Sequence, residues 1–109
     1  MLEDIFSTLG DPTRKGIIEV LRTRPRRAGE LAQRLGTSPQ AMSKHLRLLR
    51  QHGLVEEQSP PDDARARVYT LRPEPFARMQ EWLEEVAGFW TDQLAGFKAH
   101  AEKKKGKRP

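Results

Sequence analysis

The chain has 109 residues and a net charge of +5, so its length is that of a single domain with a small core. A mean hydropathy of -0.78, no apolar run of roughly eighteen residues and no signal-peptide core exclude a transmembrane helix and predict a cytoplasmic protein. Cysteine is absent, which excludes disulfides, thiolate catalysis and every metal centre that needs a cysteine ligand.

Four helices are predicted in the first half of the chain, from apolar residues at helical spacing and from helix-start pairs such as Asp-Pro and Ser-Pro. They span residues 2–9, 12–22, 28–35 and 39–52. Gly36 is placed to end the third helix. The last two helices are joined by about three residues that include this glycine, which is the helix-turn-helix pattern.

A β-hairpin and a long helix are predicted in the second half. Residues 54–58 and 67–71 are rich in β-branched and aromatic residues, and the turn formers of residues 59–63 separate them. Over residues 76–101 apolar side chains recur every three or four positions, which predicts a helix ~39 Å long. We expect the basic segment 98–109 to be a disordered tail. This order of elements predicts a mainly α winged helix-turn-helix fold with a small β-hairpin and a long C-terminal dimerisation helix.

The last helix carries more apolar surface than one small domain can cover, so we expect a homodimer. Its apolar seam has a nearly heptad spacing, which suits packing against another helix. The first helix is expected to take part in the same interface. The residues predicted at the dimer interface are Leu2, Ile5, Phe6, Trp82, Val86, Phe89, Trp90, Leu94 and Phe97.

Positive charge is concentrated in residues 22–50, which carry eight basic side chains and one acidic side chain. Such a block indicates a polyanion partner, although a solvated basic face would have the same composition. In the fourth helix Met42, Leu46 and Leu49 form an apolar stripe, and the opposite stripe is polar and basic, as in a helix that enters the major groove of DNA. The alternative is an ordinary solvated helix face. The residues predicted to contact DNA are Ser38, Gln40, Ala41, Ser43, Lys44 and Arg47 at this helix, and Arg65 and Arg67 in the hairpin.

Three stretches of the sequence resemble the arsenical-resistance repressor (ArsR) family of bacterial transcription regulators: LGDPTRKGIIEVL, GELAQRLGTSPQAMSKHLRLLRQHGLVE and RVYTL. The resemblance covers about residues 2–97 and implies a homodimer that binds operator DNA, usually as a repressor. The segment EWLEEVAGFWTDQLAGFKAH resembles the metal-independent branch of this family. Gln40, Ser43 and Lys44 stand where family members usually touch DNA. We therefore expect residues 1–97 to form one DNA-binding and dimerisation domain.

Several polar residues near these motifs have two interpretations. Arg14 either contacts a phosphate or donates a hydrogen bond to a turn carbonyl of the chain itself. The arginines of residues 22–27 are either solvated or placed alongside the duplex. His45 is expected to be packed and hydrogen-bonded rather than catalytic. The hairpin departs from the family pattern at residues 60–63 (PPDD), whose carboxylates would repel phosphates.

Neither a regulatory metal site nor an enzymatic site is expected. Family members that sense metals through thiolates place cysteines at positions that are Arg27 and Gly29 in this chain. Those that bind zinc at the last helix use paired histidines there, whereas this helix has only His100. No Ser-His-Asp order, glycine-rich phosphate loop or histidine pair suggests catalysis. We expect a cofactor-free repressor whose partners are operator DNA and a second copy; the alternatives are a winged-helix protein-interaction module and a sensor of an unidentified effector.

Overall fold

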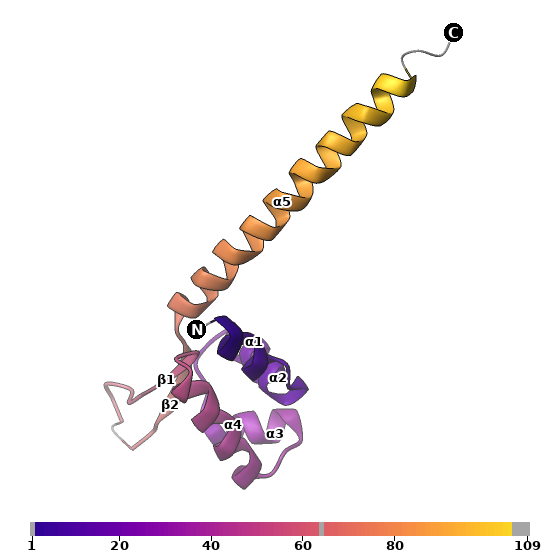
Figure 1. The fold of residues 1–109 in the computed structure, drawn as a ribbon. Coiled ribbons are helices and arrows are strands. Elements are labelled where there is room, and N and C mark those ends of the chain that lie inside the picture. Colours follow the sequence, from indigo (N-terminus) through magenta and orange to yellow (C-terminus); the bar gives the residue numbers. More distant parts are fainter. Residues whose placement is uncertain (1, 64, 106–109) are drawn as a thin grey trace. The chain divides into compact units, whose positions relative to one another are not determined.

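The structure is a computed structural model, and its helices and strands follow in the predicted order. It describes residues 2–63 and 65–105, except for the side chains of residues 91 and 97–105. The elements are α1 (Leu2–Leu9), α2 (Pro12–Leu21), α3 (Ala28–Leu35), α4 (Pro39–Gln51), β1 (Val55–Gln58), β2 (Val68–Leu71) and α5 (Pro73–Lys105), as Figure 1 shows. The prediction of a mainly α winged helix-turn-helix with a small hairpin is confirmed.

Local sequence signals set the helix ends as predicted. The Asp11 carboxylate caps α2 by accepting a hydrogen bond from the Arg14 backbone N–H at 3.1 Å. Ser38 caps α4 in the same way, because its hydroxyl accepts a hydrogen bond from the Ala41 backbone N–H at 3.1 Å. Gly36 ends α3 with a φ of 64°, a left-handed conformation that glycine adopts without steric cost. These caps fix the short turn that joins α3 to α4.

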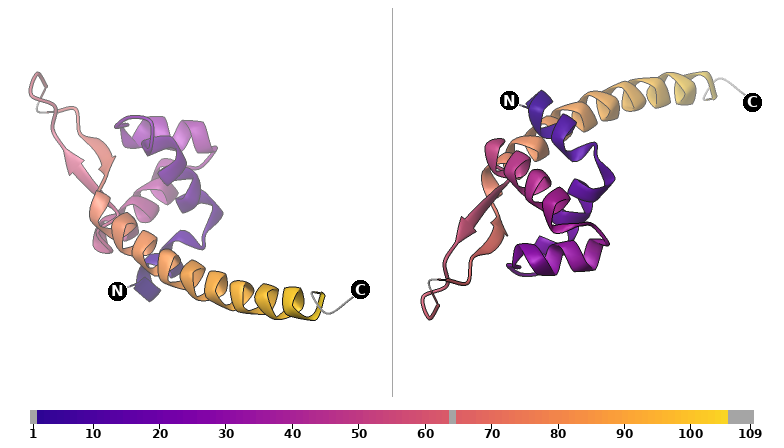
Figure 2. Two further views of the ribbon diagram at one scale, coloured as in Figure 1. Left: turned by 90° about the horizontal axis from the view of Figure 1, so that it is seen from above. Right: turned by 90° about the horizontal axis from the view of Figure 1, so that it is seen from below.

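The core of residues 1–77 lies where α2, α3 and α4 pack together, beside the base of the hairpin (Figure 2). Burying each Leu, Ile or Met side chain there contributes about 1.5–3 kcal/mol. The apolar residues buried in this part of the chain include Ile5, Ile17, Leu21, Leu31, Met42, Leu46, Leu49, Leu54 and Val55. Helices α2 and α3 approach closely at Gly16, where a Cβ atom would lie 3.1 Å from Leu35 Cδ2. The absence of a side chain at this glycine therefore permits the close packing of α3.

The two strands pair in antiparallel fashion, with Val55 opposite Leu71 and Glu57 opposite Tyr69. A further backbone pairing was not predicted from the sequence. Arg26, between α2 and α3, donates an N–H to the Tyr69 carbonyl at 3.1 Å and accepts the Tyr69 N–H at 2.7 Å. This pairing joins the hairpin to the segment that leads into the helix-turn-helix.

Two compact units divide the chain, residues 1–77 and residues 78–109. The boundary at residue 77 falls within α5, because a long single helix contacts mainly its own residues three and four positions away; one domain over residues 1–97 stays a prediction. Helix α5 begins at Pro73, three residues before its apolar seam, since proline is tolerated in a first helical turn. It includes residues 98–105 of the expected disordered tail, because Ala, Glu and Lys are strong helix formers. Residues 106–109 of that tail lie outside the described residues.

None of the helices in the described part of the chain combines the length and the apolar character that crossing a membrane requires.

Candidate nucleic-acid interface

Helix α4 has one buried face and one exposed face. The side chains of Met42, Leu46 and Leu49 are at most 1% exposed and belong to the core, as predicted. Residues three and four positions apart share one face of a helix, so the side chains opposite this apolar stripe form one continuous polar and basic stripe. Its members, all exposed, are Gln40, Ser43, Lys44 and Arg47. Their contact with DNA stays a prediction.

The start of α4 has fewer free donors than the sequence suggests. The Ser38 hydroxyl accepts the Ala41 N–H, and the Ser38 carbonyl accepts the Met42 N–H at 2.9 Å. Pro39 has no N–H. The donors left for an anion in this turn are therefore the Gln40 N–H and the hydroxyl hydrogen of Ser38, whose side chain is exposed. Ala41 is half-buried, and its backbone N–H is already engaged by the Ser38 hydroxyl, so its predicted contact with DNA stays a prediction.

The hairpin arginines predicted to contact DNA, Arg65 and Arg67, are both exposed. The Asp63 carboxylate accepts the Arg65 backbone N–H at 3.0 Å, so this aspartate helps to fold the tip. Arg67 Nη1 lies 3.3 Å from Glu57 Oε1, and Arg50 Nη1 lies 3.0 Å from Glu57 Oε2. Glu57 therefore joins the last turn of α4 to the hairpin.

Arg14 makes its contacts within the chain. Its Nε donates a hydrogen bond to the Thr8 carbonyl at 2.5 Å, and its Nη1 lies 3.4 Å from His45 Nδ1. His45 Nδ1 lies 4.0 Å from Asp11 Oδ2. The pKa of Asp11 lies below its usual value of 3.8, chiefly because the Arg14 backbone N–H donates to its carboxylate. These contacts confirm the turn-carbonyl interpretation of Arg14, and they confirm that His45 is partly buried and hydrogen-bonded.

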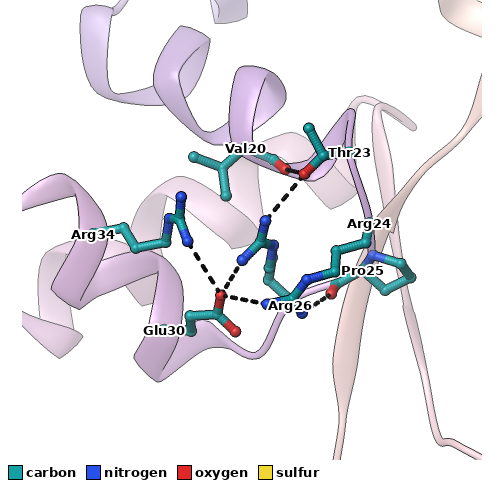
Figure 3. A network of polar contacts seen from close by, with 7 residues as sticks. All are labelled: Val20, Thr23, Arg24, Pro25, Arg26, Glu30 and Arg34. Atoms are coloured by element: carbon teal, nitrogen blue, oxygen red, sulfur yellow. Dashed lines mark hydrogen bonds and ion pairs between the residues drawn. The ribbon is translucent and has the colours of Figure 1, made fainter.

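Three arginines surround Glu30 in the first turn of α3 (Figure 3). Glu30 Oε2 pairs with Arg26, and it lies 3.3 Å from Arg24 Nη2 and 3.8 Å from Arg34 Nη1. The pKa of Glu30 lies below its usual value of 4.5, first because Arg26 donates a hydrogen bond to its carboxylate. Arg26 is only 7% exposed. Its interpretation as a solvated or duplex-flanking arginine is wrong, because Glu30 neutralises its charge inside the fold.

The roles of two acidic residues in this region, Glu30 and Glu57, were not predicted from the sequence. Glu30 precedes Arg34 by four positions on a predicted helix, a spacing that favours an ion pair, so that contact was recognisable. The contacts of Glu57 run from a strand to a helix and to the far arm of a hairpin. No spacing in the sequence indicates them.

Several of the side chains predicted at the dimer interface are exposed in the single chain. On α5 these are Trp82 (41% exposed), Phe89 (58%), Trp90 (59%) and Leu94 (64%), and Phe6 on α1 is 38% exposed. Leu2 and Val86 are half-buried, and the side chain of Phe97 lies outside the described part of the structure. The assignment of Ile5 to the interface is wrong, because this side chain is 1% exposed and already buried within the chain.

Metal-ligating side chains do not gather in the described part of the chain: no three His, Asp or Glu side chains there are arranged to hold an ion. The side chain of His100 lies outside that part. The expected lack of a metal site therefore stays a prediction.

Comparison with known proteins relates the chain to transcriptional regulators. Residues 9–58 match a helix-turn-helix domain family. The chain is 38% identical over 92 residues to the HTH-type transcriptional regulator Rv2034 of Mycobacterium tuberculosis, across 84% of this chain and 80% of that protein. It is 29% identical over 56 residues to the transcriptional repressor SdpR of Bacillus subtilis, across 51% of this chain and 62% of that protein. The structure of an ArsR-like transcriptional regulator from Rhodococcus sp. RHA1 matches with a TM-score of 0.74 and 33% identity, over 92% of each chain.

Proposed function

Because the chain belongs to the ArsR family of winged helix-turn-helix transcriptional regulators, we propose that it acts as a homodimer that binds operator DNA and represses transcription. The members of this family are regulators and not enzymes. The similarity to SdpR, a transcriptional repressor, supports repression as the direction of control.

The observation that carries this proposal is the exposed polar and basic stripe of α4, backed by a buried apolar stripe. In such a helix the amide of Gln40 can make two hydrogen bonds to an adenine edge, and Lys44 or Arg47 can reach a guanine or a phosphate. Ser43 is a short donor, and the Ser38 hydroxyl and the Gln40 N–H lie at the helix start, where phosphates bind. Arg65 and Arg67 of the hairpin extend the contact to the DNA backbone or to the minor groove.

We assign dimerisation to the exposed apolar side chains of α5, with Phe6 and Leu2 of α1. Large apolar side chains at 41–64% exposure are costly in water, and a second copy would cover them. A two-fold symmetric dimer presents two copies of α4. Half-site centres on the operator should therefore lie about one helical turn apart, or a multiple of that distance.

DNA binding in this proposal requires no metal ion. The chain has no cysteine and three histidines. Two of the histidines, His45 and His52, lie in or directly after α4, and the third, His100, has no second histidine near it in the sequence to complete a pair.

The test is a selection of bound sequences from a pool of random duplexes, followed by titration of the selected duplex and a scrambled one at several salt concentrations. We expect a sequence with two-fold symmetry and a steep salt dependence, because phosphate contacts release counterions. The combined variant Gln40→Ala, Ser43→Ala, Lys44→Ala should fold and dimerise but lose the preference for the selected duplex. Gln80→Ala, which removes an exposed side chain of α5, is the matched control. A wild-type protein that is not retained on any duplex would instead indicate a protein-interaction module.

A further inference from the structure

One carboxylate, that of Glu57, holds two arginines that come from different elements. Its Oε2 lies 3.0 Å from Nη1 of Arg50, in the last turn of α4, and its Oε1 lies 3.3 Å from Nη1 of Arg67, beside β2. The Glu57 side chain is 16% exposed, whereas those of Arg50 and Arg67 are 52% and 69% exposed. The carboxylate is thus sheltered between two guanidinium groups that face water.

The position of this cluster continues the exposed stripe of α4. Arg50 follows Arg47 by three positions and Ser43 by seven, so all three lie on one face of the helix. Arg67 brings a second guanidinium to the same place from the hairpin. The three charged groups sum to one positive charge, so the junction between α4 and the hairpin still attracts an anion.

Tyr69 is the cross-strand neighbour of the carboxylate. It stands opposite Glu57 in the antiparallel register and is half-buried. The pKa of its hydroxyl is raised, first by burial and then by the nearby charge of Glu57, while the charges of Arg50 and Arg67 act in the opposite direction. The charges of Glu57 and Arg50 therefore lie beside a half-buried phenol as well as beside solvent.

Each guanidinium has five N–H donors, and its contact with Glu57 uses one Nη group. The two guanidiniums lie at the two oxygens of one carboxylate, and their remaining donors can bind the oxygens of a phosphate. We propose that Arg50 and Arg67 form a phosphate-binding site at the junction of α4 and the hairpin, and that Glu57 is the positioning residue that holds them. This site rests on the proposed function. It adds one contact with the DNA backbone, which α4 and the hairpin make together.

A positioning role for Glu57 and simple charge repulsion predict opposite changes in DNA affinity when the carboxylate is removed. If the Glu57 carboxylate only repels phosphate, its removal tightens binding to any DNA. If it positions the two arginines, its removal weakens binding even though the protein becomes more positive. Glu56 provides the matched control, because it is the neighbouring carboxylate on β1. Successive side chains of a strand point to opposite faces, so Glu56 and Glu57 lie on different faces of the hairpin. The Oε1 of Glu56 accepts a hydrogen bond from Gln58.

The experiment uses the full chain and a labelled random-sequence duplex of about 30 base pairs, since phosphate contacts do not depend on sequence. Dissociation constants are measured at several KCl concentrations for the wild type and for Arg50→Ala, Arg67→Ala, Glu57→Gln, Glu56→Gln and the combined Glu57→Gln, Arg67→Ala variant. Thermal unfolding of each variant checks that the fold is kept.

The single arginine variants should each reduce the slope of log Kd against log salt by about 0.9 per chain. Glu57→Gln should weaken binding by about two- to fivefold per chain, as for the loss of one exposed ion pair, whereas Glu56→Gln should not weaken it. In the Glu57→Gln background, Arg67→Ala should reduce the slope by less than it does in the wild type.

Two results would overturn this inference and leave the proposed function standing. One is an unchanged salt slope in both arginine variants, with a wild type that binds the duplex. The other is a Glu57→Gln variant that binds as tightly as the wild type, or more tightly, as Glu56→Gln does. A wild type without any salt-dependent binding would instead overturn the proposed function itself.

Discussion

Arg14 Nε donates a hydrogen bond to the backbone carbonyl of Thr8, at 2.5 Å. Thr8 is buried in the last turn of α1, where carbonyl groups lack a helical donor. The guanidinium therefore satisfies the end of one helix from the first turn of the next. Because α1 and α2 are joined through this contact, Arg14 has a structural role that its position in a basic sequence does not suggest.

Arg14→Ala should lower the free energy of unfolding by about 1–2 kcal/mol, because a buried carbonyl loses a charged donor. It should leave the salt slope of DNA binding unchanged, since the side chain is engaged within the chain. Urea denaturation and a salt titration measure the two effects. An unchanged stability together with a reduced slope would show that Arg14 binds phosphate instead.

Lys44→Ala tests the exposed stripe of α4. The side chain is exposed, so the fold and the dimer should persist while binding to the operator weakens. If Lys44 reads a base, discrimination at one position per half-site should relax by roughly 1–3 kcal/mol; if it binds phosphate, affinity should fall on all sequences and the salt slope should shrink by about one per site. Titration on operator and scrambled duplex separates the two cases. Equal binding by the variant and the wild type on both duplexes would remove Lys44 from the interface.

Trp90→Asp tests the dimer. The indole is 59% exposed in the single chain, and in a dimer the substitution places an unpaired charge in an apolar interface, at a cost of several kcal/mol. Sedimentation at micromolar concentration should show dissociation or unfolding. Ala95→Asp introduces the same charge at an exposed position on the other side of α5 and should leave the dimer intact. A wild type that sediments as a monomer at that concentration would refute the assignment.

Removal or addition of metal should not change DNA binding, because the chain offers neither cysteine nor a paired histidine on its last helix. Operator affinity at pH 7 should be the same with millimolar EDTA, with added zinc and with neither. A reproducible change by an order of magnitude would reveal a ligand set that the sequence does not suggest.

Acid should remove the stabilisation that Glu30 provides. The pKa of Glu30 is lower in the folded chain than its usual value of 4.5. The stabilisation that its carboxylate provides is therefore complete above pH 4.5 and is lost as the pH falls through the folded-state pKa. The melting temperature of the wild type should therefore fall more steeply below pH 4.5 than that of Glu30→Gln. Glu19→Gln, whose carboxylate lies 3.7 Å from Arg22 on the surface, is the control. Melting temperatures that fall in parallel with decreasing pH for the wild type and Glu30→Gln would contradict the prediction.

The sequence by itself determined most of the local structure. Asp11 before Pro12, Ser38 before Pro39 and Gly36 act on the residues next to them, and the helix bounds in residues 2–51 agree with the prediction to within one residue. The buried stripe of α4 follows from its spacing of apolar residues in the same way. Caps, proline effects and helical periodicity all act over a few positions, and a linear sequence shows such interactions directly.

Only the tertiary structure decided which charged side chains form ion pairs within the chain. Arg26 and Arg65 are both arginines in segments that were expected to be solvent-exposed, yet Arg26 is 7% exposed beside Glu30 while Arg65 is exposed on the hairpin. Glu57 meets Arg50 and Arg67 through strand pairing and the packing of β1 after α4. An ion pair depends on distances of a few ångströms, and chain segments far apart in sequence reach such distances only when the core has packed.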